Sequence, residues 1–131
     1  MLELKDYVTV AMAQAMQEAG YNEATSEVYS NDNAKGEWRM YHKAGKWYNA
    51  LPAPTLYEAT KWLRSMGYYA AAQPHPLPNS GQLLFYATID LVEDNRFADR
   101  LTDIQHQTYE QALAAGILVA VRSIINKNQK R

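Results

Sequence analysis

The sequence predicts an α+β fold in which a small antiparallel sheet packs against about three helices, in the order α-β-β-α-β-β-α. A helix-start signature occurs twice, at Thr55-Leu56-Tyr57-Glu58-Ala59 and at Thr108-Tyr109-Glu110-Gln111-Ala112. In each copy the Thr hydroxyl can accept a hydrogen bond from the N–H three residues on, and the Glu or Gln there can reach back to the Thr N–H. Strand-forming residues precede both copies, so strands and helices are expected to alternate.

The first predicted helix begins after Thr9, which is a good N-cap residue, and buries Met12, Ala13 and Met16. Residues 6–8 are expected to be extended. Gly20 ends the helix, because the residue after a helix end often adopts a left-handed conformation.

Two strand regions are predicted before the second helix. Residues 25–29 form a weak strand candidate, and the polar residues 30–36 form a turn. Residues 37–49 are predicted to be a hairpin around Lys43-Ala44-Gly45-Lys46, with aromatic residues in both arms.

The second helix is expected to start sharply at Thr55, because Pro52 and Pro54 interrupt regular structure before it. It runs to about Met66 and ends at Gly67. Its apolar stripe is predicted to contain Leu56, Ala59, Leu63 and Met66, flanked by Trp62.

A strand, a loop and a long strand follow this helix. Residues 68–72 are predicted to be a short strand, and residues 73–81 a stiff loop, because three prolines exclude a helix or an inner strand. This loop is a candidate for an exposed functional loop. Residues 83–92 alternate strongly and predict a strand, with a turn at residues 94–96.

The last predicted helix follows Thr108, and its apolar face is wider than a normal stripe. It is therefore either central to the core or part of a subunit interface. In the second case Gly116, Val119 and Ala120 are the candidate contacts with a protein partner, which could be a second copy in a homodimer, because small residues allow close approach. The proline-rich loop beside Tyr68 is a second candidate surface.

Domain organisation follows from the length of 131 residues. We expect a single α+β domain over residues 1–126 and a frayed basic tail over residues 127–131. The repeated unit of strands followed by a Thr-capped helix is compatible with a remote internal duplication. Against a duplication, a Thr-Tyr-Glu start is a common local way to begin a helix, and the loops before the two copies differ in length.

Composition excludes several classes of function. The chain has no cysteine, which removes disulfides, cysteine nucleophiles, zinc fingers and iron–sulfur sites. Thirteen basic residues nearly cancel fourteen acidic ones, so no overall field attracts nucleic acid or a membrane. The apolar run at residues 112–121 is about half the ~20 residues that span a bilayer. Without a secretory signal at the N-terminus, we expect a cytoplasmic protein with no membrane partner.

No constellation for catalysis is visible, so a non-enzymatic protein without metal or cofactor is expected. The three histidines, His42, His75 and His106, lie apart and lack the spacing that places two ligands on one helix face. Acidic residues 90–103 lack the regular spacing of a calcium loop and are predicted to be a solvated face. Ser80 lies in a turn and not in a nucleophile elbow.

Nucleic-acid binding is the alternative function, and it would use the basic and aromatic hairpin at residues 38–48. Its candidate contacts are Arg39, Lys43, Lys46 and Trp47, which offer cations for phosphates and a ring on which bases can stack. Against this, strand aromatics usually pack under helices, and lysine at a hairpin turn is ordinary.

Three segments together resemble a family of small uncharacterised proteins that are carried by bacteriophages and prophage-like elements of gut bacteria. They are Val8-Thr9 with the helix end Ala19-Gly20-Tyr21-Asn22-Glu23, then Ala53-Pro54-Thr55-Leu56-Tyr57-Glu58-Ala59 leading into Lys61-Trp62-Leu63-Arg64, and finally Thr108-Tyr109-Glu110-Gln111-Ala112. The chain departs from the family at Ala11, Ala15, Gln17 and the loop at residues 74–78. The resemblance spans nearly the whole chain and implies a context, an accessory protein of a mobile element, without implying a mechanism.

These observations lead to one expectation. The chain is predicted to be a non-enzymatic accessory protein that works through an unidentified protein partner, with nucleic-acid binding as the alternative.

Overall fold

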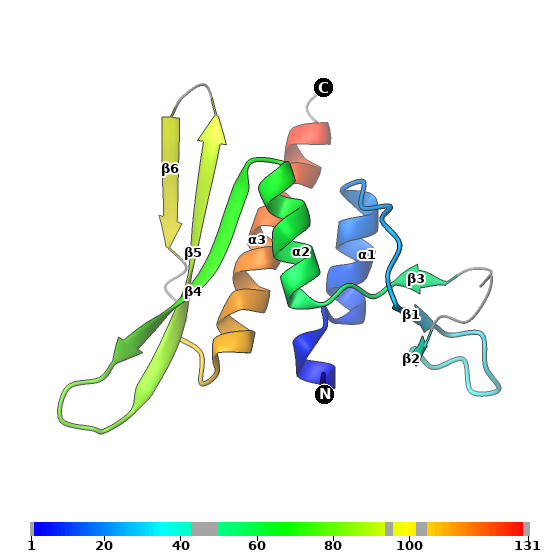
Figure 1. The fold of residues 1–131 in the computed structure, drawn as a ribbon, viewed down its shortest axis with the longest axis horizontal. Helices are drawn as coiled ribbons and strands as arrows, with labels where there is room; N and C mark the ends of the chain where they lie inside the picture. The colour runs from blue at the N-terminus through cyan, green and yellow to red at the C-terminus, as the bar shows by residue number, and fades with distance from the viewer. Residues whose placement is uncertain (1, 43–49, 94–95, 102–104, 130–131) are drawn as a thin grey trace.

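The α+β prediction is confirmed by a computed structural model, which describes residues 2–42, 50–93, 96–101 and 105–129 (Figure 1). The helices are the short 3₁₀ turn η1 and α1, α2 and α3, and the strands form two separate antiparallel sheets. In chain order the elements are η1 (Leu4–Asp6), α1 (Val10–Glu18), β1 (Glu27–Ser30), β2 (Arg39–His42), β3 (Leu51–Pro52), α2 (Leu56–Ser65), β4 (Tyr68–Pro76), β5 (Leu83–Glu93), β6 (Arg96–Leu101) and α3 (Tyr109–Gln129).

The three α-helices lie side by side between the two sheets (Figure 1). The sheet of order β4-β5-β6 lies beside α3, and the smaller sheet of order β2-β1-β3 lies on the far side of α1. The sequence predicts one small sheet, whereas the strands before α2 and after α2 pair only among themselves. No helix in the described part of the chain is both long enough and apolar enough to cross a membrane.

The predicted helix starts are confirmed at all three Thr residues. Thr9 accepts a hydrogen bond from the N–H of Met12 at 3.2 Å, and Thr108 accepts one from the N–H of Gln111 at 3.1 Å. Thr55 forms both bonds of a capping box with Glu58, at 3.0 Å and 2.9 Å. These caps satisfy backbone donors that an α-helix leaves free at its first turn.

The apolar stripe of α2 differs from the prediction at two residues. Trp62, expected at the flank, is buried, whereas Met66 is 45% exposed. The helix ends at Ser65, and the chain turns through Gly67 with a positive φ of 87° before β4 begins. Met66 therefore lies in the turn and is not part of the apolar stripe of α2.

Strand β4 continues to Pro76, so the prediction of a loop from residue 73 is wrong for residues 73–76. The reason is that β4 is an edge strand. Pro74 pairs with Phe85, and the N–H and C=O of Phe85 bond to His106 on the other side of β5. The nitrogen of Pro74, and by the same alternation that of Pro76, therefore points outward, where the missing N–H disrupts no ladder bond.

The first half of the chain also differs from the expected pairing. The weak strand prediction at residues 25–29 corresponds to β1, and β2 pairs with β1. The turn and second arm of the predicted hairpin, residues 43–49, lie outside the described residues. Residues 4–6 form a 3₁₀ turn, so Asp6 is not extended as predicted. Strand β6 was not anticipated, because the sequence predicts a turn at residues 94–96 and three of the six residues of β6 are charged.

The core is centred on α3, which packs against β4 and β5 as well as against α1 and α2. A Cβ atom added to Gly116 would lie 3.1 Å from the Cβ of Ala87 and 3.9 Å from that of Ala70, which shows how closely α3 approaches the sheet. Met16, Leu63 and Ile117 are fully buried in this core. Helix α3 continues to Gln129, three residues past the point at which the sequence predicts fraying.

Replacement of Gly116 by Val is expected to lower the free energy of unfolding by about 1–3 kcal/mol, because the branched side chain has no room against Ala87. Urea unfolding followed by circular dichroism measures the loss. Asn126→Val on the exposed part of the same helix is the control and should stay within about 0.5 kcal/mol of the parent. Equal stability of the two variants would contradict the close packing.

Replacement of Thr55 by Ala is expected to cost about 1 kcal/mol of folding stability, because it removes one bond of the capping box and the local geometry that supports the other. Thr9→Ala removes a single cap bond and serves as the comparison. Thermal and urea unfolding measure both. A Thr55→Ala variant as stable as the parent would show that the capping box contributes nothing.

Candidate functional site

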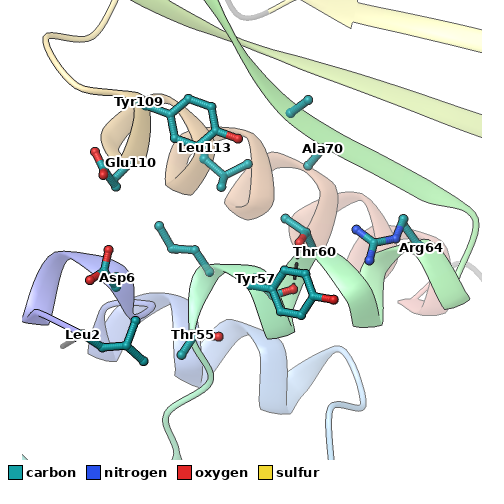
Figure 2. Close-up of a pocket in the computed structure, with 12 residues that line it drawn as sticks. Leu2, Asp6, Thr55, Tyr57, Thr60, Arg64, Ala70, Tyr109, Glu110 and Leu113 are labelled. Carbon is teal, nitrogen blue, oxygen red and sulfur yellow. Dashed lines mark hydrogen bonds between the residues drawn. The ribbon is translucent and has the colours of Figure 1, made fainter.

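A groove of about 610 Å³ opens where the first turns of α2 and α3 meet η1 and strand β4 (Figure 2). Its volume lies in the usual range of ligand sites. The lining contains leucines, alanines, two tyrosines and three charged residues: Leu2, Asp6, Thr55, Leu56, Tyr57, Thr60, Arg64, Ala70, Ala71, Tyr109, Glu110 and Leu113.

Local backbone contacts bring these elements together. Tyr7 forms an antiparallel bridge with Thr55, and the N–H of Val8 donates to the carbonyl of Pro54 at 3.0 Å, so η1 is held beside the start of α2. The mutual backbone hydrogen bonds of Phe85 and His106 hold the chain against β5 just before α3 begins. The two helix starts therefore lie on either side of the groove (Figure 2).

The floor of the groove is apolar, and two tyrosines stand at its rim. Leu56 and Leu113 are buried. Tyr57 is 68% exposed and Tyr109 is 47% exposed. The ring of Tyr109 contacts that of Phe85 edge to face, with centroids 6.2 Å apart, which restricts its position. Large exposed rings beside an apolar floor are typical of binding surfaces.

Charged groups of opposite sign lie at opposite ends of the groove (Figure 2). Asp6 and Glu110 lie at one end, and Arg64 lies at the other. One oxygen of Asp6 accepts the N–H of Glu3 at 2.8 Å. None of the ion pairs found within the described residues includes Arg64 or Glu110. The groove therefore has a negative end and a positive end, and each end can pair with a side chain of opposite charge in a bound partner.

A second groove of about 510 Å³ contains one of the residues predicted to bind nucleic acid. Arg39 lines it together with Trp38, which is 39% exposed. Arg39 also forms an ion pair with Glu37 at 3.3 Å. Lys43, Lys46 and Trp47 lie outside the described residues.

The residues predicted to form a protein interface occupy a different place from the groove. Gly116 and Ala120 are buried within the chain, and Gly116 approaches the chain's own sheet. Val119 is half-buried and packs partly against the core. In this fold the close approach that the small residues permit is therefore used inside the chain.

The three histidines lie apart in the structure. His42 contacts Glu27 at 3.0 Å in the smaller sheet, the ring of His75 lies against Tyr86, and His106 bridges to Phe85 through its backbone. Within the described residues, no three groups of the His, Cys, Asp or Glu kind are placed to hold a metal ion.

Tyr29 and Tyr21 are both buried in the core. Tyr29 donates its hydroxyl hydrogen to the carbonyl of Val8, and burial raises its pKa. Tyr21 packs edge to face against Trp62 at 5.3 Å, and its hydroxyl has no hydrogen-bond partner within the described residues. Burial, with smaller effects from Glu58 and Glu23, raises the pKa of Tyr21 to about 12.

The sequence prediction missed the groove, although it named several of its residues. Tyr57 and Tyr109 both lie in the first turn of a helix that follows a Thr cap, and both are members of the capping signature found in the sequence. A large aromatic residue off the buried stripe of a predicted helix is the signal that could have marked Tyr57. Tyr109 shares a helix face with the buried Ala112 and Leu113, so only the tertiary structure shows that it is exposed. Leu2 carries no such signal in the sequence.

Comparisons with known proteins add no relative. The chain matches no protein-family profile, no curated protein and no solved structure.

Tyr21 gives a prediction for stability at high pH. Its ordinary pKa is 10.0, so between pH 10 and about pH 12 the unfolded chain loses this proton while the folded chain keeps it. The free energy of unfolding should therefore fall as pH rises through this window. Tyr21→Phe should make the fall less steep in urea unfolding, whereas the exposed Tyr69→Phe should follow the parent. Parallel curves for Tyr21→Phe and the parent would contradict the raised pKa.

Proposed function

We propose that this chain is a non-enzymatic accessory protein and that it binds a protein partner in the groove between η1, α2, β4 and α3. The single observation that carries the proposal is the exposure of Tyr57 and Tyr109 on either side of an apolar floor. Aromatic side chains at the rim of a groove are favoured binding contacts, because they bury a large area at a low cost in side-chain entropy.

The origin and location that we propose rest on the sequence. The three segments at residues 8–23, 53–64 and 108–112 support an origin in bacteriophages or related mobile elements of bacteria. The absence of cysteine supports work in the cytoplasm. An accessory protein of this kind would act by binding and not by catalysis.

The proposal is tested by selecting binders from a displayed library of random nine-residue peptides, with the full chain as the immobilised target. Peptides that bind the groove should lose at least tenfold in affinity for Tyr57→Ser and Tyr109→Ser, because each change removes an exposed ring from the rim. Fluorescence anisotropy with labelled peptides measures the affinities.

Tyr69→Ser is the matched control, because Tyr69 is 45% exposed, close to the value for Tyr109, and does not line the groove. Its affinity for the selected peptides should equal that of the parent. A selection that yields no binders, or binders that tolerate both rim variants, would overturn the proposal.

Nucleic-acid binding by residues 38–48 is the second candidate function, and the exposure of Trp38 beside Arg39 favours it. The ion pair of Arg39 with Glu37 weighs against it, because a phosphate would have to compete with this carboxylate. If this function is present, Lys43→Ala, Lys46→Ala and Trp47→Ala together should abolish retention on a single-stranded DNA or RNA column while circular dichroism stays unchanged. Retention equal to that of the parent would exclude these residues as contacts.

A further inference from the structure

We infer that the partner enters the groove as a short extended segment, with a basic side chain at the end near Asp6 and Glu110, an acidic side chain at the end near Arg64, and an apolar side chain between them. This inference rests on the proposed function and names the chemistry of the partner. It follows from the placement of charge, the length of the groove and the open edge of β4.

The charges set the two ends of the occupant. Asp6 in η1 and Glu110 in the first turn of α3 lie at the same end of the groove (Figure 2). Two carboxylates at one end attract a lysine or arginine of the partner. Arg64 at the opposite end carries a planar group that binds a carboxylate through two parallel hydrogen bonds.

The distance between these ends sets the length of the occupant. The bridge between Tyr7 and Thr55 places η1 at the level of the first turn of α2. Arg64 follows Thr55 by nine positions (64 − 55), which corresponds to a rise of about 13 Å along a helix. An extended chain covers about 3.3 Å per residue, so about four residue steps, or five residues, join the two ends.

The backbone of β4 favours an extended occupant over a helical one. Pairing alternates along β4, and since Pro74 points its nitrogen outward, the N–H and C=O groups of Ala70 and Ala72 also point away from β5. Ala70 lines the groove at the Arg64 end. An extended segment can add hydrogen bonds to such an unpaired edge.

Only one half of the β4 edge is protected against pairing with another strand. Pro74 and Pro76 remove the outward N–H groups from the second half of β4, which is a common protection of edge strands. Residues 68–72 contain no proline and no charged residue. The unprotected half, residues 68–72, is the half that reaches the groove. Its outward N–H and C=O groups can therefore bond to a segment that lies there.

The middle of the occupant faces an apolar floor. Leu113 lies between the acidic end and Arg64 (Figure 2), and Leu56 also lines the groove. A leucine or phenylalanine at the centre of the five residues would bury its side chain there, and the rings of Tyr57 and Tyr109 would exclude water from its sides. The expected motif is therefore a basic residue and an acidic residue four positions apart, with a large apolar residue midway.

The test is to sequence the peptides selected on the parent chain and, in parallel, on Arg64→Glu. The parent should enrich peptides in which a basic and an acidic residue lie four positions apart around a large apolar residue, in either chain direction. Arg64→Glu should enrich peptides that are basic at both positions. A synthetic peptide with the parent motif, blocked at both termini, should bind Arg64→Glu at least fivefold more weakly than it binds the parent.

Lys61→Glu is the matched control, because it makes the same change of charge on the exposed face of the same helix without lining the groove. Its selected motif and its affinity should equal those of the parent. Peptides that depend on Tyr57 and Tyr109 but lack the charge pattern would overturn this inference and leave the proposed function standing. A selection without peptides that depend on these rings would overturn both.

Discussion

The close contact between α3 and the sheet of β4 and β5 is the constraint on which the rest of the structure depends. Gly116 faces the small side chains of Ala87 and Ala70, and a Cβ at Gly116 would lie only 3.1 Å from that of Ala87. Because protein interiors are packed as densely as organic crystals, this approach leaves little freedom in the position of α3. Helix α3 in turn contacts α1 and α2, so its position sets theirs. The groove lies between the starts of α2 and α3, so its shape depends on the position of α3.

The candidate site lies at two helix starts, each of which has a Thr cap. Thr55 and Thr108 accept hydrogen bonds from N–H groups in the first turns of their helices, and the carboxylate of Glu58 accepts one from the N–H of Thr55. Because Glu58 and Glu110 place carboxylates in the first turns of the two helices, these helix starts do not favour an anion in the groove. We therefore expect side chains that line the groove to recognise the partner. The exposed rings of Tyr57 and Tyr109 provide contact area, and the charged ends of the groove set the orientation in which a partner binds.

Charge has different roles in different parts of the described chain. The ion pairs Lys5–Glu3 and Arg39–Glu37 join residues close in sequence, and both members of each pair are largely exposed. Such pairs contribute little to stability, because water screens them. Arg64 and Glu110 form no such pair within the described residues and lie at a partly apolar groove, where charges mainly determine which partner binds and in which orientation.

The sequence by itself determined the helices and the fold class, because a Thr cap, an apolar stripe and a terminal glycine act within a few residues of one another. It determined the long strand at β5 for the same reason, through its alternation. Only the tertiary structure decided that Gly116 and Ala120 face the chain's own core, that β4 extends through Pro74 and Pro76 as an edge strand, and that two separate sheets form. The groove is also a tertiary result. Leu2, Tyr57 and Tyr109 are far apart in the chain, and long-range packing and strand pairing alone bring them together, because no local pattern encodes which surfaces meet.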